Sequence, residues 1–104
     1  MSLFSKVKDT YRIQKDAKRI KKELKSIHIE AEEEGIVQVT VSAEQELVSV
    51  KYTENAMSNL KNGSLNKEKL EELTVKTINR AMKKAQEIAG QKMKVVWDQM
   101  GSLK

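Results

Sequence analysis

Apolar residues in the first quarter of the chain recur at the spacing of one helix face. The stripe that they form comprises Ile13, Ala17, Ile20, Leu24 and Ile27. Steps of three and four residues keep side chains on one side of an α-helix, so the pattern predicts a helix over residues 2–27. Phe4, Val7 and Tyr11 form a second apolar patch roughly opposite this stripe. Two alternatives are open for that patch: it packs on another element of the same molecule, or it contacts a partner chain.

Over residues 27–53 the apolar period changes to two, which indicates β-strands. The apolar positions are Ile27, Ile29 and Ala31, then Val37, Val39 and Val41, and finally Val48, Val50 and Tyr52. We expect three short antiparallel strands, with one turn at Glu32–Glu34 and Gly35 and a second at Ala43–Glu46. Because each strand has one apolar and one polar face, helices should cover only one side of the sheet.

Residues 54–66 are rich in Asn and Ser and are expected to form a loop, with a short turn around Met57 and Leu60. A second long helix should begin near Asn66, a good N-cap residue, and run to about Met100. Its apolar face comprises Leu70, Leu73, Ile78, Ala81, Met82, Ala85, Ile88, Ala89, Met93, Val96 and Met100. Gly90 inside this helix marks either close packing or a weak point. The expected fold is α+β with the order α-β-β-β-α, in one domain spanning residues 1–104.

The composition narrows the class of protein. The chain has 104 residues, no Cys, and only one Trp, two Tyr and one Phe. One copy should therefore bury little apolar surface for its length, and we expect a homodimer. No apolar run approaches the roughly 18 residues of a membrane span, and the N-terminus lacks the apolar stretch of a secretory signal. A cytoplasmic protein without a membrane segment is expected.

Charge is segregated along the chain. Residues 1–27 have nine Lys or Arg against three acids, a net of +6; residues 28–54 have one against seven, −6; residues 55–104 have ten against five, +5. The field of the acidic middle segment repels phosphate, so a bound nucleic acid should lie on the helices.

The sequence contains no complete set of residues for a catalytic or metal-binding site. His28 is the single His, and there is no Cys to complete a metal site or a nucleophile. Glu32–Glu34 lack the alternating spacing of a calcium loop, and the four Gly residues are too scattered for a phosphate loop. We therefore predict no catalytic residues, no cofactor, no metal and no small-molecule substrate, and we expect a protein that is not an enzyme.

Two rows of basic residues, which we call ridges, are the candidate binding residues. The first-helix ridge follows spacings of four and three residues and comprises Lys8, Arg12, Lys15, Arg19 and Lys22, flanked by Lys18 and Lys25. The last-helix ridge is less regular and comprises Lys69, Lys76, Arg80, Lys83 and Lys94, with Glu87 interrupting it. Cations repeated along a helix can follow the phosphates of a nucleic acid, although many helices have a solvated lysine face that binds nothing. Too few aromatic residues are available for a ladder that stacks single-stranded bases, so duplex DNA is the better target.

Several segments resemble the YbaB/EbfC family of bacterial nucleoid-associated proteins. They are Gly35–Val41, Val48–Val50, Asn66–Leu73, Asn79–Ala81 and Gln91–Met93, and the resemblance extends over nearly the whole chain. Two segments depart from the family pattern: Ser42–Glu46 replaces a short Asn-Gly-like turn, and Ala31–Glu34 replaces a glycine-rich entry to the sheet. The geometry of both hairpins is therefore open. The first helix is more basic than the family pattern, which favours contact with DNA.

The resemblance implies a tweezer-like homodimer that is joined mainly through its sheets and binds double-stranded DNA with little sequence preference. It also implies a bacterial or phage-related source. Two alternatives of other classes are a protein-interaction adaptor whose lysines only keep it in solution, and a basic amphipathic helix on an anionic membrane surface.

Overall fold

Six elements make up the computed structural model, which describes the backbone of residues 3–101 and the side chains of residues 10–99. They are α1 (Leu3–Ser26), β1 (His28–Glu33), β2 (Val37–Ser42), β3 (Leu47–Tyr52), α2 (Glu54–Lys61) and α3 (Lys67–Gly101). The α+β class is confirmed, as are both long helices and all three strands. The order is α-β-β-β-α-α, because α2 adds a helix that the sequence pattern did not predict.

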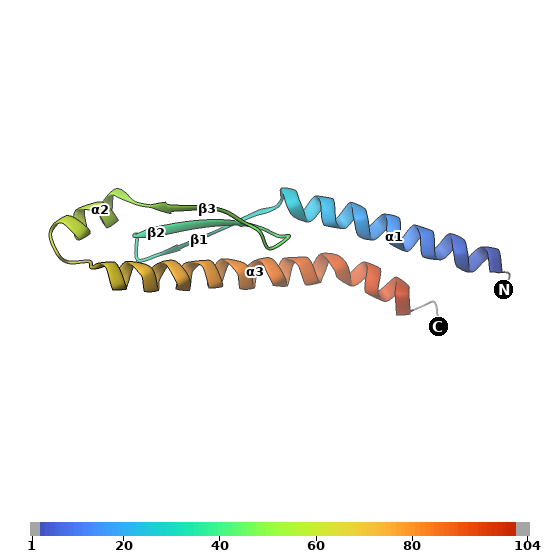
Figure 1. Ribbon diagram of the computed structural model, residues 1–104. Coiled ribbons are helices and arrows are strands. Elements are labelled where there is room, and N and C mark those ends of the chain that lie inside the picture. The colour runs from blue at the N-terminus through green and yellow to red at the C-terminus, as the bar shows by residue number, and fades with distance from the viewer. Residues whose placement is uncertain (1–2, 102–104) are drawn as a thin grey trace.

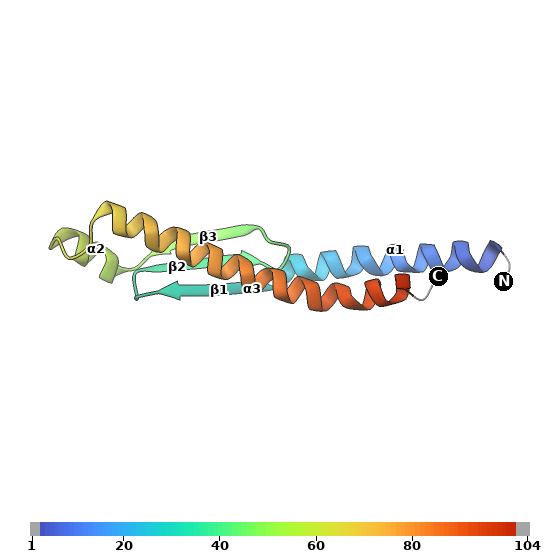
Figure 2. The same cartoon turned by 90° about the horizontal axis from the view of Figure 1, so that it is seen from below.

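The elements form a rod of 73 × 20 × 15 Å, and the long helix α3 extends along most of its length (Figure 1). The sheet lies along the N-terminal half of α3, and α1 lies alongside its C-terminal half (Figures 1 and 2). We call α1 together with residues 85–101 of α3 the helical arm. The start of α1 and the end of α3 lie at the same end of the rod, and α2 lies at the other.

The sheet has the strand order β1-β2-β3, and both pairings are antiparallel. β1 and β2 contact α3 while the opposite face of the sheet is uncovered, which confirms that helices cover one side only. In the turn between them, the amide of Ile36 donates a 2.9 Å hydrogen bond to the carbonyl of Glu33. Glu34 and Gly35 both have positive φ, 52° and 66°, which is the pattern of a type I′ hairpin turn. The turn is therefore tighter than predicted, and Glu32 and Glu33 belong to β1.

In the second hairpin, the amide of Ser42 donates a 2.8 Å hydrogen bond to the carbonyl of Glu46, which encloses a loop of three residues, 43–45. Gln45 donates its amide to the carbonyl of Ser42 at 2.9 Å and has a φ of 69°. A residue with positive φ at the end of the loop is typical of three-residue hairpin loops. A separate bulge lies farther along β3: Thr40 is opposite Ser49 but Val41 is opposite Leu47, so Val48 is left without a partner.

The bulge and the edge position of β3 correct one prediction. Val48 and Tyr52 were expected to be buried with Val50, but they are 50% and 43% exposed, and Val50 is only half-buried. β3 is the strand farthest from the axis of α3, because α3 packs on β1 and β2. A regular apolar alternation cannot show either the extra residue or which strand lies at the edge.

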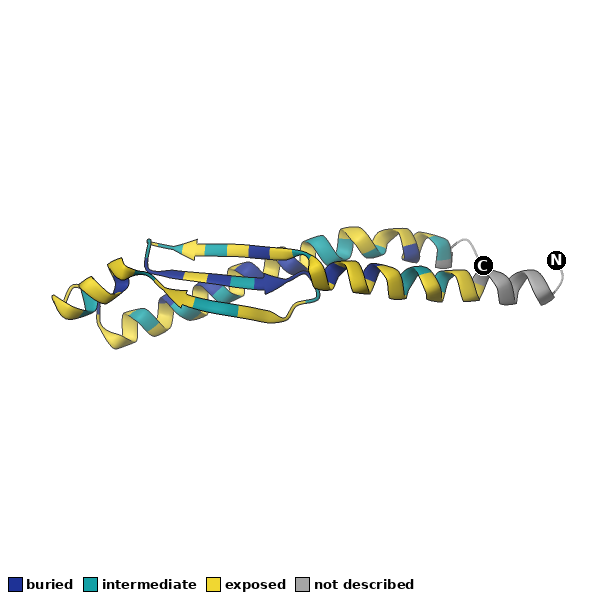
Figure 3. Ribbon diagram, turned by 90° about the horizontal axis from the view of Figure 1, so that it is seen from above, coloured by how far each residue is buried: buried dark blue, intermediate teal, exposed yellow. Residues whose placement is uncertain are grey.

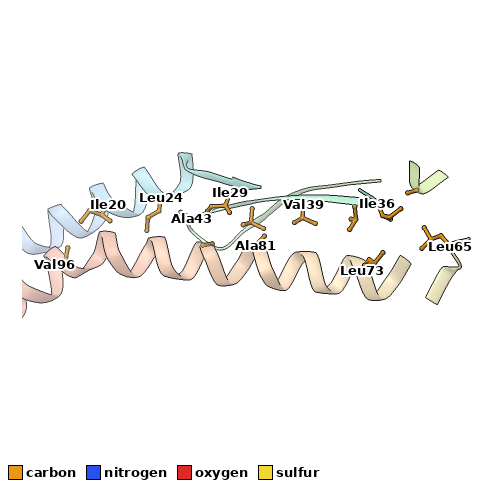
Figure 4. Close-up of a cluster of buried hydrophobic side chains, with 14 residues drawn as sticks. Ile20, Leu24, Ile29, Ile36, Val39, Ala43, Leu65, Leu73, Ala81 and Val96 are labelled. Carbon is orange, nitrogen blue, oxygen red and sulfur yellow. The ribbon is translucent and has the colours of Figure 1, made fainter. Parts of the chain in front are cut away.

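The core is aliphatic and follows β2 and the inner face of α3 (Figures 3 and 4). Val37, Val39 and Val41 are almost completely buried, and Leu73 and Ala81 of α3 pack in the same cluster. At the arm, the predicted stripe of α1 continues this core: Ile20, Leu24 and Val96 are buried, and Ile13, Ala17 and Ile27 are partly buried. Thr77 is also fully buried; its hydroxyl donates to the carbonyl of Leu73 at 2.5 Å, which explains a polar residue on this face.

The segment predicted as a loop contains the eight-residue helix α2. Its N-cap is Thr53, whose hydroxyl oxygen accepts from the amide of Ala56 at 3.1 Å and donates to the carbonyl of Gly35 at 2.5 Å. Ala56 is completely buried and Leu60 partly buried, so contacts with the core compensate for the weak helix propensity of the Asn and Ser residues. Asn66 caps α3 as predicted, accepting from the amide of Lys69 at 2.8 Å.

Candidate nucleic-acid interface

The packing of the arm leaves the basic side of α1 in water. Ile13, Ala17, Ile20 and Leu24 turn toward α3 and the core, so residues on the other side of α1 have no neighbouring element. The exposed ridge residues are Arg12, Lys15, Lys18, Arg19, Lys22 and Lys25. The side chain of Lys8 lies outside the described residues, as do those of Phe4 and Val7. Tyr11, the one described member of the predicted apolar patch, is 67% exposed and is not among the residues that pack on the core.

Among the described side chains, acidic neighbours pair with one of these cations. Arg19 lies 3.6 Å from Asp16 and 3.9 Å from Glu23, so its charge is shared along the helix. Among the described side chains, no ion pair within 4.0 Å involves the other five exposed ridge residues. The first-helix ridge is therefore available to a ligand with negative charge.

The last-helix ridge differs, because the acidic hairpin lies against its first half. Lys69 pairs with Glu34 at 3.9 Å, and Lys76 pairs with Glu33 at 3.9 Å. Arg80 donates to the carboxylate of Glu33 at 2.5 Å. Glu33 itself has a side chain that is only 13% exposed, whereas its two partners are mostly in water. Lys83 and Lys94 are exposed farther along α3. The sequence did not predict these contacts of Glu33 and Glu34 with the last-helix ridge.

A hollow of about 430 Å³ lies where the arm meets the sheet, and it was not predicted. Three elements line it: α1 with Ala17, Lys18, Lys21 and Leu24, the β2–β3 turn with Ala43, Glu44 and Gln45, and α3 with Ala89 and Met93. Lys21 is exposed and is absent from the predicted ridge. Lys21 could have been identified from the sequence, because it follows Lys18 by three residues and that spacing places both on one side of the helix.

The described part of the chain offers no arrangement for metal or membrane chemistry. Within residues 10–99, no three His, Asp or Glu side chains come together where they could hold a metal ion. His28 is exposed at the start of β1. None of the helices in the described residues has the length and apolar composition that crossing a bilayer requires.

A comparison with known protein families is consistent with the exposed cations of the helical arm. The model of the YbaB/EbfC DNA-binding family matches residues 2–100, which is nearly the whole chain. The chain belongs to the YbaB/EbfC DNA-binding family. No curated protein sequence matches it. The resemblance inferred from the strand and helix segments is thereby confirmed, and membership of the YbaB/EbfC family identifies DNA as the class of ligand.

Proposed function

We propose that this protein is a non-enzymatic, nucleoid-associated protein that binds the backbone of duplex DNA as a homodimer, with little sequence preference. The observation that carries the proposal is the exposed, unpaired part of the first-helix ridge on a YbaB/EbfC chain. Arg12 and Lys25 are thirteen residues apart on one helix, which corresponds to about 20 Å along its axis. Cations distributed over that length match a row of phosphates better than a single base edge.

The ion pairs rank the candidate contacts. Among the described side chains, five ridge residues have no acidic partner to lose on contact with DNA: Arg12, Lys15, Lys18, Lys22 and Lys25. Lys76 and Arg80, by contrast, must leave Glu33. Arg19, Lys83 and Lys94 are secondary contacts: Arg19 already has two acidic neighbours, and the other two lie on α3, outside the first-helix ridge. Lys8 extends the ridge toward the start of α1 by its position in the sequence.

The salt dependence of binding tests this proposal. A dimer presents two ridges and should neutralise on the order of 4 to 8 phosphates, which gives a log-log slope of about −0.9 per phosphate. Replacing Arg12, Lys15, Arg19 and Lys22 by Gln should lower affinity and make the slope shallower, by about the same factor on unrelated duplexes. Fluorescence anisotropy across a range of salt concentrations measures both quantities.

The matched control changes four exposed cations that lie elsewhere. Replacing Lys69, Lys76, Arg80 and Lys83 by Gln removes the same charge, but three of these residues are already paired with Glu33 or Glu34. We expect this variant to lose less affinity than the α1 variant. Equal affinity and slope in the α1 variant and the unchanged protein would reject the ridge as the DNA contact. No binding by the folded protein at low salt would reject the function.

A further inference from the structure

Every aromatic side chain that the structure describes lies at the surface. Tyr11 is 67% exposed, Trp97 57% and Tyr52 43%. The hydroxyl of Tyr52 lies 3.0 Å from that of Thr74, which connects this ring to α3. Tyr11 and Trp97 lie instead on the two helices of the arm. Because the buried cluster is formed by aliphatic residues and includes neither ring, both rings are available to a ligand.

Exposed cations lie near both rings in the sequence. Arg12 follows Tyr11 directly, and Lys15 comes one turn later on the same side of α1. Lys94 precedes Trp97 by one turn of α3. Among the described side chains, no ion pair within 4.0 Å involves these three cations. Each ring is therefore placed beside positive charge that is available to phosphate.

We propose that Tyr11 and Trp97 enter a groove of duplex DNA, while Arg12, Lys15 and Lys94 bind the phosphates that border it. This inference rests on the DNA binding proposed above and adds a contact that is not electrostatic. A ring beside phosphate-bound cations faces sugars and base edges, and apolar side chains in a groove unstack base steps and bend the helix. The chain has too few aromatic residues for a ladder that stacks the bases of a single strand, so the duplex is the ligand.

The proposal has a consequence for site choice. Base steps such as TA and CA/TG deform more easily than others, so aromatic insertion should favour duplexes that contain them. The preference should be modest, because phosphate contacts supply most of the affinity and do not depend on sequence.

Trp97 is the single Trp of the chain and reports directly on its own surroundings. The experiment titrates the full-length protein with a duplex of about 25 base pairs, and separately with inorganic polyphosphate, which offers charge but no groove. Duplex should change the intensity and wavelength of Trp97 emission, and polyphosphate should not. The same change with both polyanions, or no change with saturating duplex, would overturn the proposal. A blue-shifted emission in the free protein that duplex leaves unaltered would place Trp97 in a contact between chains, which also overturns it.

Paired variants separate the rings from the charges. Changing Tyr11 and Trp97 to Gln should weaken duplex binding about tenfold, abolish DNA bending measured by energy transfer between labelled ends, and leave the salt slope intact. Changing both to Phe should retain affinity and bending. Val95→Gln is the matched control, because Val95 is 58% exposed on the same turn of α3.

The outcomes distinguish this inference from the function on which it rests. Duplex binding with the expected salt slope but unaltered affinity and bending in the Gln variant would reject aromatic insertion alone. Absence of any duplex binding would reject both. If the Gln variant does not fold, judged by circular dichroism, the emission of Trp97 in the unchanged protein decides the question.

Discussion

Glu33 connects the acidic hairpin to α3 through two ion pairs. Its carboxylate contacts both Arg80 and Lys76, and its side chain is nearly buried between the sheet and the helix. Arg80 is 47 residues away in the sequence, so the pairing could not be derived from spacing along the chain. The alternation of β1 did contain a signal, since Glu33 continues the inward positions of Ile29 and Ala31. An acid at an inward position requires a cationic partner, and the last-helix ridge provides two.

Glu33→Gln tests whether this pairing limits DNA binding. Because the amide cannot neutralise Arg80 or Lys76, both cations become available to phosphate, and we expect equal or higher affinity for duplex DNA. The free energy of unfolding, measured in urea, should fall by at most about 1 kcal/mol, since both cationic partners are largely solvated. Glu32→Gln is the control, because Glu32 is exposed and has no ion pair among the described side chains. A large loss of affinity in Glu33→Gln with unchanged stability would place the DNA on the acidic hairpin.

At the level of elements, the sequence predicted those whose stability follows from local periodicity and failed where tertiary contacts decide. Both long helices and the three strands followed from apolar periods of 3.6 and 2. α2 did not, because its Asn and Ser residues favour a loop and only the burial of Ala56 and the cap at Thr53 stabilise the helix. The exposed side of α1 was predictable in the same way as its buried stripe. The pairing of the last-helix ridge and the hollow beside Lys21 depend on how separate elements meet.

Two glycines in open surroundings should respond to Ala in opposite ways. A Cβ at Gly90 or at Gly63 would meet nothing within 4 Å, so neither is required for close packing within the chain. Gly90 lies inside α3, where Ala should raise the free energy of unfolding by about 1 kcal/mol. Gly63 has a φ of 83°, a conformation that costs Ala about 1 kcal/mol, so Gly63→Ala should destabilise. Thermal unfolding of both variants at one protein concentration shows whether each substitution stabilises or destabilises the protein. Destabilisation by Gly90→Ala would instead indicate that another chain approaches this part of α3.

At the scale of the whole molecule, the edge strand β3 exposes apolar side chains and backbone groups that a second copy would cover. Leu47 and Val48 are about half exposed on β3, at 47% and 50%, and Tyr52 follows at 43%. β3 is also an edge strand, whose outward backbone groups have no strand partner within the described chain. Antiparallel pairing of β3 with β3 of a second copy would cover both features. Since the strands lie along the axis of the rod, such a dimer has one helical arm at each end (Figure 1).

A charge on this edge should separate the two copies. Val48→Lys places an ammonium group where the second β3 would pack, so sedimentation should show a monomer under conditions in which the unchanged protein is a dimer. Because a monomer presents one first-helix ridge instead of two, its affinity for duplex DNA should fall and its salt slope should be about half as steep. Val75→Lys is the control: Val75 is 58% exposed on α3, and the substitution adds the same charge away from β3. A dimer that persists in Val48→Lys would move the interface to another surface, and a monomer with an unchanged salt slope would show that each arm binds DNA independently of the other.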